Sequence, residues 1–452
     1  MDFAGSSVLV MGLARSGEAV ARLLQKLGAR VTVNDAKPKE ALAAAENLEA
    51  DGIKVVAGDH PLTLLDECDL IVKNPGIPYD RPLLVEATAR GIPIVTEVEI
   101  AYAVTKSPII GITGSNGKTT TTSLVGYIFE KAGRPAIVAG NIGTPLAAVA
   151  YDSDPAEWII AELSSFQLQG TSAFRPHIAA LLNLYPAHLD YHGSMSAYIA
   201  AKSHIFANQQ STDIAILSLD HAQVADLSTW IPATVWWISV KEIVPRGVYL
   251  RDGIIYYAPG GQGEDPIAII PIDDMLLRGM HNVENALAAC AVSLAAGISI
   301  SAIADGLREF GGVVHRLEFV REKDGVRYVN DSKATNPQAA IRAIESFSEP
   351  LIGILGGLDR GDDLTPLISP VKRHMKAVLT IGQSGSRMQE VAKMAEITQI
   401  YAVSSIEEAV LLSHRLAEKG DVVLLSPAAA SWDMFTSFEE RGDIFKQAVH
   451  ML

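Results

Sequence analysis

Residues 111–122 read GITGSNGKTTTT and directly follow the apolar pair Ile109 and Ile110. This order predicts a strand, a glycine-rich loop and a helix that begins near Lys118. Backbone N–H groups of such a loop converge on phosphate oxygens, the lysine counters their charge, and Thr119 offers a hydroxyl to Mg²⁺. The match is to a variant of G-x-x-x-x-G-K-[ST], because Ile112 stands where the first glycine belongs. We therefore expect ATP on Gly114, Ser115, Asn116, Gly117, Lys118, Thr119 and Thr120.

Length and composition indicate what class of protein carries this loop. With 452 residues, 48% of them apolar, the chain is long enough for two or three domains with large cores. A net charge of −15 argues against binding to nucleic acid or anionic lipid. The two cysteines form no metal-type pair and suit a reducing cytosol. The N-terminus lacks the features of a secretory signal, so we expect a cytoplasmic protein.

The longest uncharged stretch, residues 286–304, is rich in alanine and broken by Gly297. It is too weakly apolar for a membrane span, and a buried helix hairpin is the better interpretation. We expect no membrane insertion.

Three segments alternate strand-like and helix-like runs, which predicts an α/β protein with three largely parallel sheets. The strand-like runs of the first segment include residues 7–12, 30–35, 69–77 and 91–99. Those of the second include 108–113, 157–162, 177–184 and 213–219, and those of the third 325–332, 350–357, 377–382 and 421–427. We place the domains at 1–97, 98–312 and 313–452.

Polar residues end several of these apolar runs, where ligands bind in open parallel sheets. They are Thr113, Glu162, Asn183 and Asp213 in the second segment, and Asp331 and Ser426 in the third. We expect the chemistry at these strand ends.

The first segment carries GLARSG at residues 12–17, with Asp35 after the next strand. The pattern is close to the dinucleotide fingerprint, with Ala14 in place of the middle glycine. It is compatible with NAD, with the diphosphate of another nucleotide such as a UDP-sugar, or with a tight turn that binds nothing.

The second segment carries isolated candidates for metal and acid–base chemistry. Glu162 follows a strand, so it is either a Mg²⁺ ligand beside the phosphate loop or a surface acid. His188 and Asp190 lie in NLYPAHLDYHG, and Lys202 lies in YIAAKSHIF. These residues alone assign neither His188 nor Lys202 a role.

Taken together, these motifs resemble the Mur ligases, the ATP-dependent amino-acid-adding enzymes of peptidoglycan synthesis. The resemblance rests on the phosphate loop, AELSSFQL, HLDYHG with AAK, HNVENAL, HRLE and NDSKATN, whose order covers nearly the whole chain. NDSKATNPQA, LGGLDRG and LSPAAASWDMF are similar to the members that add D-glutamate to UDP-N-acetylmuramoyl-L-alanine. The resemblance implies a Rossmann-like first domain, a P-loop-type central ATPase domain, a Rossmann-like third domain and a monomer.

The resemblance also implies roles for individual residues. The UDP-substrate would meet Leu13, Ala14, Arg15, Asp35, Pro75, Gly76, Ile77, Asn141 and His188. ATP would also meet Asn282, Asn285, Arg316 and Asp331. Two Mg²⁺ ions would be held by Thr119, Glu162, His188 and Lys202. Lys202 matches the lysine that the family carbamylates, which turns a cation into an oxygen ligand suited to Mg²⁺.

The amino-acid pocket implied by the resemblance comprises Lys333, Thr335, Arg360, Ser431, Trp432 and Phe438. Arg360 stands where some members have lysine, and Trp432 is bulkier than the leucine of others. An arginine retains the charge and can bind a carboxylate bidentately.

The expected reaction uses ATP to turn a carboxylate into an acyl phosphate, which the amine of D-glutamate then attacks. Lys118, Lys202, Arg316 and His188 would be the catalytic residues, with His188 a candidate base for the amine. The alternatives are a sibling Mur ligase or a folylpolyglutamate-type ligase that adds another amino acid, an NAD-dependent oxidoreductase, and a nucleotide-binding module without turnover.

Overall fold

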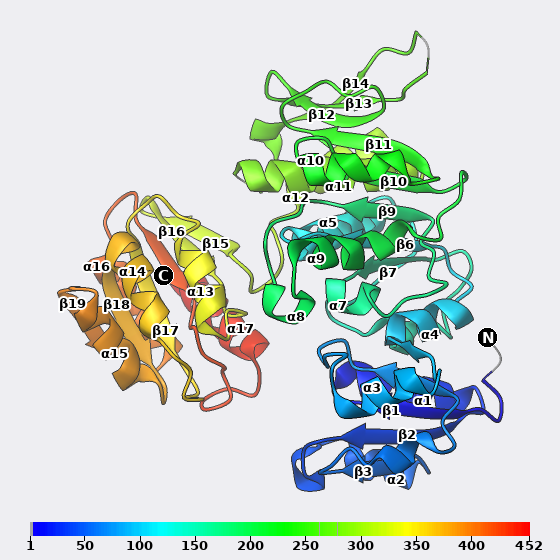
Figure 1. Ribbon diagram of the computed structural model, residues 1–452. Helices are drawn as coiled ribbons and strands as arrows, with labels where there is room; N and C mark the ends of the chain where they lie inside the picture. The colour runs from blue at the N-terminus through cyan, green and yellow to red at the C-terminus, as the bar shows by residue number, and fades with distance from the viewer. Residues whose placement is uncertain (1–2, 262, 278) are drawn as a thin grey trace. The chain divides into compact units, whose positions relative to one another are not determined.

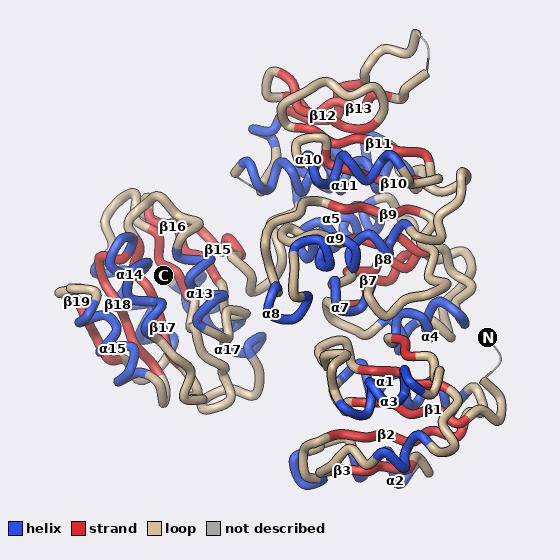
Figure 2. Tube along the Cα trace, in the orientation of Figure 1, coloured by secondary structure: helices blue, strands red, loops and turns tan. Residues whose placement is uncertain are grey.

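The computed structural model describes residues 3–452 apart from 262 and 278 (Figure 1). The chain forms two compact units, residues 1–310 and 311–452, each described here by itself. The division falls two residues before the predicted boundary at 312. Strands and helices alternate along nearly the whole chain (Figure 2), and the strands form three sheets. The predicted α/β fold with three mostly parallel sheets is therefore confirmed.

The first sheet has five parallel strands in the order β3-β2-β1-β4-β5. Its strands are β1 (Ser7–Met11), β2 (Arg30–Asp35), β3 (Lys54–Ala57), β4 (Leu70–Lys73) and β5 (Ile94–Val95). Its helices are α1 (Arg15–Lys26), α2 (Ala45–Ala50) and α3 (Pro82–Ala89). The strand order reverses beside β1, so the loops after β1 and β4 lie next to each other, where such sheets bind ligands.

The run at residues 91–99 forms only a two-residue strand, and α4 (Glu97–Val104) follows it. Two buried acids explain why the strand stops. The carboxylate of Glu97 accepts a hydrogen bond from the backbone N–H of Ala147, and that of Glu99 accepts from the backbone N–H groups of residues 172–174. A continued strand would not place both acids against these donors, because successive strand side chains face opposite ways.

The second sheet has nine strands in the order β14-β13-β12-β11-β10-β9-β6-β8-β7. Only the pairings of β12 with β13 and of β13 with β14, at one edge, are antiparallel. Its strands are β6 (Ile109–Thr113), β7 (Ala136–Gly140), β8 (Trp158–Glu162), β9 (Ile178–Leu181), β10 (Ile214–Ser218), β11 (Thr234–Ser239), β12 (Gly247–Arg251), β13 (Ile254–Ala258) and β14 (Ile267–Pro271). Its helices are α5 (Lys118–Lys131), α6 (Leu146–Val149), α7 (Ser165–Leu168), α8 (Leu189–His192), α9 (Met195–Ser203), α10 (Ala222–Ala225), α11 (Met280–Ala295) and α12 (Ile300–Glu309). Helix α5 packs on β6 to β8, and α11 packs on β9 to β12.

The uncharged stretch at 286–304 belongs to α11 and α12, which contact each other and α5. Ala286 to Val292 are fully buried, so the stretch lies in a protein core and the predicted hairpin is confirmed. Within the described part of the chain, we find no helix with the length and apolar character needed to span a bilayer.

The C-terminal unit holds six strands in the order β15-β16-β20-β17-β18-β19, and only β15 runs antiparallel to its neighbour. They are β15 (Glu318–Lys323), β16 (Val326–Asn330), β17 (Leu351–Gly356), β18 (Met375–Ile381), β19 (Gln399–Ala402) and β20 (Val422–Leu425). Helices α13 (Pro337–Ile344), α14 (Ile368–His374), α15 (Gly385–Met394), α16 (Ile406–Leu416) and α17 (Phe438–Met451) accompany them. Separate apolar cores lie on the two faces of this sheet.

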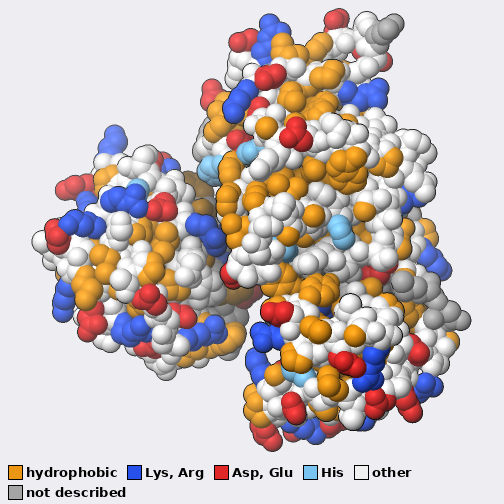
Figure 3. Space-filling model, viewed as in Figure 1, with side chains coloured by type: hydrophobic (Ala, Val, Ile, Leu, Met, Phe, Trp, Pro, Cys, Tyr) orange, Lys and Arg blue, Asp and Glu red, His pale blue; other side chains and the backbone are white. Residues whose placement is uncertain are grey.

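One predicted strand end is wrong. Asp213 precedes β10 instead of following it, and its carboxylate pairs with Arg175 at 2.7 Å. The polar side chain after that strand is Asp220. Figure 3 shows acidic and basic side chains interspersed over the face in view, so the net charge is not gathered into one patch there.

Candidate active site

The phosphate-type loop lies at the carboxyl end of β6, between this strand and the first turn of α5. Gly117 caps the helix with a left-handed φ of 80°. The Nζ atom of Lys118 donates to the carbonyl oxygens of Gly114 at 2.8 Å and Ser115 at 3.0 Å. Thr119 is buried in the first helical turn. The loop thus holds a cation, a hydroxyl and a helix N-terminus together, as a phosphate-binding loop requires.

Asparagines from two other elements fix this loop. The side chain of Asn183, after β9, accepts from the backbone N–H of Asn116 at 2.9 Å and donates to its carbonyl. The side-chain oxygen of Asn285 accepts from Thr121 at 3.4 Å and lies against Gly117. Asn183 was noted from the sequence only as a strand end.

Substituting Gly117 with alanine is expected to displace the loop, because a Cβ there would lie 2.1 Å from the Asn285 amide oxygen. Gly133, just beyond the other end of α5, also has a positive φ but nothing near its missing Cβ. Both G117A and G133A should lose roughly 1 to 2 kcal/mol of stability through backbone strain. Only G117A should weaken binding of a non-hydrolysable ATP analogue by more than about tenfold, measured by calorimetry. Equal affinity in both variants would contradict this role of the loop.

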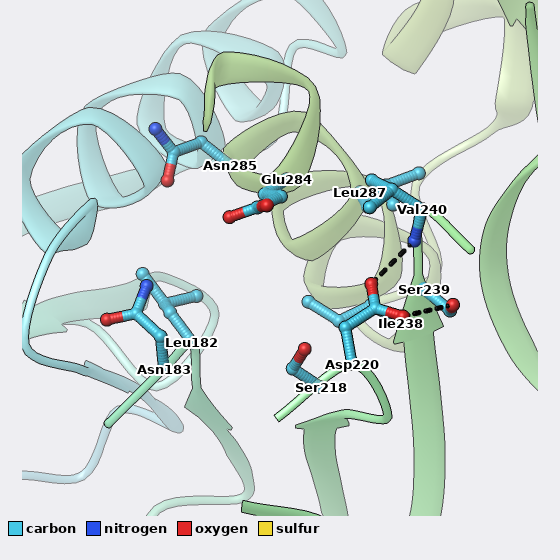
Figure 4. Close-up of a pocket in the computed structure, with 10 residues that line it drawn as sticks. All are labelled: Leu182, Asn183, Ser218, Asp220, Ile238, Ser239, Val240, Glu284, Asn285 and Leu287. Atoms are coloured by element: carbon cyan, nitrogen blue, oxygen red, sulfur yellow. Dashed lines mark hydrogen bonds between the residues drawn. The ribbon is translucent and has the colours of Figure 1, made fainter. Parts of the chain in front are cut away.

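A small cavity lies next to the loop, at the carboxyl ends of β9, β10 and β11 and under α11 (Figure 4). Its lining residues are Leu182, Asn183, Ser218, Asp220, Ile238, Ser239, Val240, Glu284, Asn285 and Leu287. Asp220 is held by Ser239 Oγ at 2.7 Å and Val240 N at 2.8 Å. Asn285, one of the residues assigned to ATP, therefore lines this cavity and contacts the phosphate-type loop as well.

Glu162 stands at the end of β8, beside the loop that follows β6. Its Oε1 accepts from Asn141 Nδ2 at 2.8 Å, and its backbone oxygen accepts from Asn141 N. Its Oε2 is buried and receives no hydrogen bond from the described residues. A buried carboxylate oxygen without a hydrogen-bond partner fits a hard cation such as Mg²⁺. Among the described residues no three His, Cys, Asp or Glu side chains cluster as a metal cage, but Mg²⁺ is usually held by one or two carboxylates with phosphates and water.

Lys202, in α9, is 1% exposed and reaches the same loop from the other side. Its Nζ donates to the Gly114 carbonyl oxygen at 2.8 Å and to Thr113 Oγ1 at 3.2 Å. Two lysines, 118 and 202, thus share one carbonyl oxygen. Burial, reinforced by the charge of Lys118, lowers the pKa of Lys202 well below its usual value. A neutral amine is the form that reacts with CO2, so this environment suits carbamylation.

The loops after β1 and β4 enclose a pocket in the first sheet's domain, lined by Gly12, Leu13, Ala14, Asp35, Ala36, Lys37, His60, Asn74, Gly76, Ile77, Pro78 and Arg81. Asp35 accepts from Leu13 N at 2.7 Å and Lys37 N at 2.9 Å. A Cβ on Gly17 would lie 2.0 Å from the Gly12 carbonyl oxygen, so the last glycine of GLARSG permits close packing of helix on strand. Of the residues assigned to the UDP-substrate from the sequence, Leu13, Ala14, Asp35, Gly76 and Ile77 line this pocket. Arg15, Pro75, Asn141 and His188 are not among its lining residues, and Asn141 contacts Glu162.

His188 immediately precedes α8 and has a left-handed φ of 55°. Its ring lies 4.9 Å from that of Phe166, in α7, which follows Glu162 by four residues. Non-glycine residues in this conformation are strained, and such strain gathers at functional sites. His315 and Leu317, which flank Arg316, have positive φ values too.

In the C-terminal unit, the segment around Arg316 is tied to the loop after β16. Asp331 accepts from Leu317 N at 3.1 Å and from Ser426 Oγ at 2.8 Å. Lys333 N donates to the carbonyl oxygen of His315. The structure therefore brings together Arg316, Asp331 and Lys333, which the sequence assigned to ATP and the amino acid. Burial raises the pKa of Asp331 to about 7.

The raised pKa of Asp331 predicts a pH dependence of stability. Between its usual value of 3.8 and about 7, the folded chain holds a proton that the unfolded chain releases. Stability therefore falls as pH rises through that window, by on the order of a few kcal/mol when complete. D331N keeps the shape and removes the titration, so its urea midpoint relative to wild type should rise from pH 4 to pH 8. D362N, at an exposed carboxylate, should show no such trend. A pH-independent difference for D331N would contradict the prediction.

Residues assigned to the amino acid surround the ends of β16, β17 and β20. The Lys333 ammonium lies 5.8 Å from the centre of the Phe438 ring, and Ser431 is buried. Arg360 lies 4.8 Å over the Trp432 ring. Arg360 and Trp432, the two positions at which the sequence departs from the pattern of the family it resembles, thus lie against each other. A guanidinium at this distance from an aromatic ring is held by a cation–π contact.

Sequence reasoning missed Arg441, in α17, which is 1% exposed. Its guanidinium donates to the hydroxyl and carbonyl oxygens of Ser332 and to the carbonyl oxygen of Ala429. It therefore joins the loops after β16 and β20. No local pattern around Arg441 signals this, because its partners are distant in sequence.

Comparisons with known proteins agree with this geometry. Residues 6–96 match the family model "Mur ligase MurD-like, N-terminal domain", 112–293 "Mur ligase middle domain" and 315–429 "Mur ligase, glutamate ligase domain". UDP-N-acetylmuramoylalanine--D-glutamate ligase of Geobacillus kaustophilus (strain HTA426) is 48% identical over 447 residues, 98% of this chain and 97% of that protein. The protein of that name from Bacillus mycoides (strain KBAB4) is 46% identical over 452 residues, 100% of this chain and 99% of the relative.

Among solved structures, UDP-N-acetylmuramate-alanine ligase MurC from Thermotoga maritima has a TM-score of 0.55 at 19% identity. The match covers 99% of each chain and shows a shared fold. The relatives at 46 to 48% identity span essentially the whole chain. The chain belongs to the Mur ligase family.

Proposed function

We infer that the chain is an ATP-dependent ligase that adds D-glutamate to UDP-N-acetylmuramoyl-L-alanine, a step of peptidoglycan precursor synthesis. The observation that carries this inference is the full-length similarity, at 46 to 48% identity, to ligases named for that reaction. The site supports this inference as well. The phosphate loop suits the phosphates of ATP, and Glu162 and a carbamylated Lys202 suit the Mg²⁺ that accompanies them. ATP bound in this way can activate a carboxylic acid.

The chemistry follows from the reluctance of a carboxylate to react with an amine in water. Transfer of the γ-phosphoryl group of ATP to the alanine carboxylate gives an acyl phosphate and ADP. The amine of D-glutamate then attacks, forming the amide and releasing phosphate. The protein supplies positioning and charge neutralisation, with Lys118 against the phosphates.

Mg²⁺ would neutralise phosphate charge when bound, and Thr119 and Glu162 are the residues best suited to hold it. Carbamylated Lys202 would supply a second anionic ligand. His188, Asn282, Arg316 and the pocket residues of the C-terminal unit keep the roles given by the resemblance. We expect the protein to act as a monomer in the cytoplasm.

Two alternatives make different demands. A sibling ligase with another amino acid would retain the ATP chemistry and differ only at the pocket of Arg360, Ser431 and Trp432. An NAD-dependent oxidoreductase would leave the phosphate loop and Lys202 unexplained.

The function is tested by phosphate release from ATP and Mg²⁺ with UDP-N-acetylmuramoyl-L-alanine and single amino acids in turn. Release that requires D-glutamate and fails with L-glutamate is expected. Release with a different amino acid would retain the ligase chemistry and reject the pocket assignment. No release with any amino acid would reject the proposed function.

A further inference from the structure

Lys73, the last residue of β4, is a buried lysine that the reaction described above does not use. It is 1% exposed. Its Nζ donates to the carbonyl oxygens of Ile77 at 2.9 Å, Pro75 at 3.1 Å and Asn74 at 3.4 Å. One ammonium group therefore holds the entire turn at residues 74–77, whose other side lines the pocket of the first domain.

Tyr191, in α8, completes this arrangement from the central domain. Its hydroxyl lies 3.2 Å from Lys73 Nζ, and it is within 3.2 Å of Pro75 O and 3.1 Å of Ile77 O. Lys73 and Tyr191, which are 118 positions apart in sequence, thus both hydrogen-bond to the carbonyl oxygens of residues 75 and 77. The turn is linked through them to the segment that begins with His188.

Aromatic side chains pack around that segment. The Phe166 ring lies 4.6 Å from the Tyr191 ring, nearly perpendicular to it, and 4.9 Å from the His188 ring. Phe166 lies four residues after Glu162, the candidate Mg²⁺ ligand. The link from Lys73 therefore runs through Tyr191 and Phe166 toward both groups assigned to the reacting end of the substrate.

The charge of Lys73 is balanced inside the turn that it holds. No carboxylate pairs with its ammonium among the described residues; the carbonyl dipoles and the Tyr79 ring, 4.5 Å away, balance its charge instead. Burial lowers its pKa to about 8. In a trans peptide the C=O and the following N–H point opposite ways, so the Gly76 N–H faces away from Lys73. That N–H lies 3.2 Å from the side-chain oxygen of Asn74, which lines the pocket.

We propose that Lys73 and Tyr191 are positioning residues for the nucleotide-sugar substrate: they hold the turn at residues 74–77 at a fixed spacing from His188. This inference rests on the proposed function, in which the UDP end meets that turn and the carboxyl end meets His188. A substrate that must be held at both ends gains affinity when its two subsites are preorganised at the correct distance. UDP alone occupies one subsite and gains nothing from the spacing.

The test compares Y191F with wild type in binding of UDP and of UDP-N-acetylmuramoyl-L-alanine by calorimetry, without ATP or amino acid. Y191F retains the ring that packs on Phe166 and loses only the hydroxyl. We expect it to weaken the full substrate roughly tenfold, since one or two hydrogen bonds are lost, and to change UDP affinity by less than about twofold. The KM for ATP should stay within about twofold of wild type. Y256F, in β13 and stacked on Tyr249, is the matched control and should bind both ligands normally.

The K73M variant tests the contact between Lys73 and Tyr191 from its other side. It should weaken the full substrate more than UDP, and in the K73M/Y191F double variant the two losses should not add, because both residues hold the same carbonyl oxygens. Should K73M fail to fold, Y191F decides alone. Equal weakening of UDP and full substrate in Y191F would overturn the proposal, and so would unchanged binding of both. Failure of wild type to bind the full substrate would instead reject the proposed function.

Discussion

Replacing Lys118 with methionine is expected to abolish ATP turnover, with a loss on the order of 10³-fold in kcat. The Lys118 ammonium stands at the start of α5, against the Gly114 and Ser115 carbonyl oxygens, where the phosphates of ATP are expected. Charge that develops on the transferring phosphoryl group would lose this fixed cation. Binding of UDP-N-acetylmuramoyl-L-alanine should be retained, since its nucleotide end is expected in the pocket after β1 and β4.

Lys131, at the opposite end of the same helix, provides the control for K118M. It forms an exposed ion pair with Glu309, so K131M changes the helix charge equally and should leave turnover within about twofold of wild type. Phosphate release and calorimetric binding of the UDP-substrate, measured on both variants, separate the roles. Turnover in K118M above about a tenth of wild type would contradict the assignment of Lys118.

Replacing Lys202 with alanine is expected to cost a similar factor, on the order of 10³ in kcat. The physical reason differs: in the proposed mechanism Lys202 would act as a carbamate, an anion that would complete a Mg²⁺ site with Glu162. Its buried position and lowered pKa supply the neutral amine that such a modification needs. A ¹³C carbamate signal should appear when wild type is equilibrated with ¹³C-bicarbonate, and it should be missing in K202A.

Arginine at position 202 distinguishes a carbamate from a cation. K202R keeps the positive charge, cannot be carbamylated, and should be as inactive as K202A. Formate or acetate, which can enter the space left in K202A, should restore part of its activity but none in K202R. Full activity of K202R, or no bicarbonate signal in active wild type, would contradict the carbamate.

The sequence predicted the features that a short stretch encodes by itself. Gly114 and Gly117 must adopt backbone angles that other residues disfavour, and the lysine and threonines follow at fixed spacing, so the loop could be read directly. The apolar runs likewise predicted where most strands lie. The end of each strand that faces the site was harder to predict. Asp213 lies before β10, and an apolar run does not show whether the polar residue beside it precedes or follows the strand.

Residues that act across long sequence separations escaped prediction. Arg441 bonds Ser332 across 109 positions, and Lys73 meets Tyr191 across 118. Each is a single polar residue among ordinary neighbours, with no periodicity or spacing to mark it. Their burial is visible only once the sheets are assembled. Long-range polar contacts of this kind position the predicted loops. The motifs therefore predicted the residues of the loops but not the distant side chains that hold the loops in place.

If ATP activates the carboxylate of the sugar-linked alanine, one oxygen atom of that carboxylate must leave with the released phosphate. UDP-N-acetylmuramoyl-L-alanine labelled with ¹⁸O in both carboxyl oxygens is incubated with ATP, Mg²⁺ and D-glutamate, and the released phosphate is analysed by mass spectrometry. An acyl phosphate requires one ¹⁸O atom in each phosphate and the other in the new amide. Phosphate without ¹⁸O, with product formed, would contradict an acyl-phosphate intermediate, because the carboxylate would then not have attacked ATP.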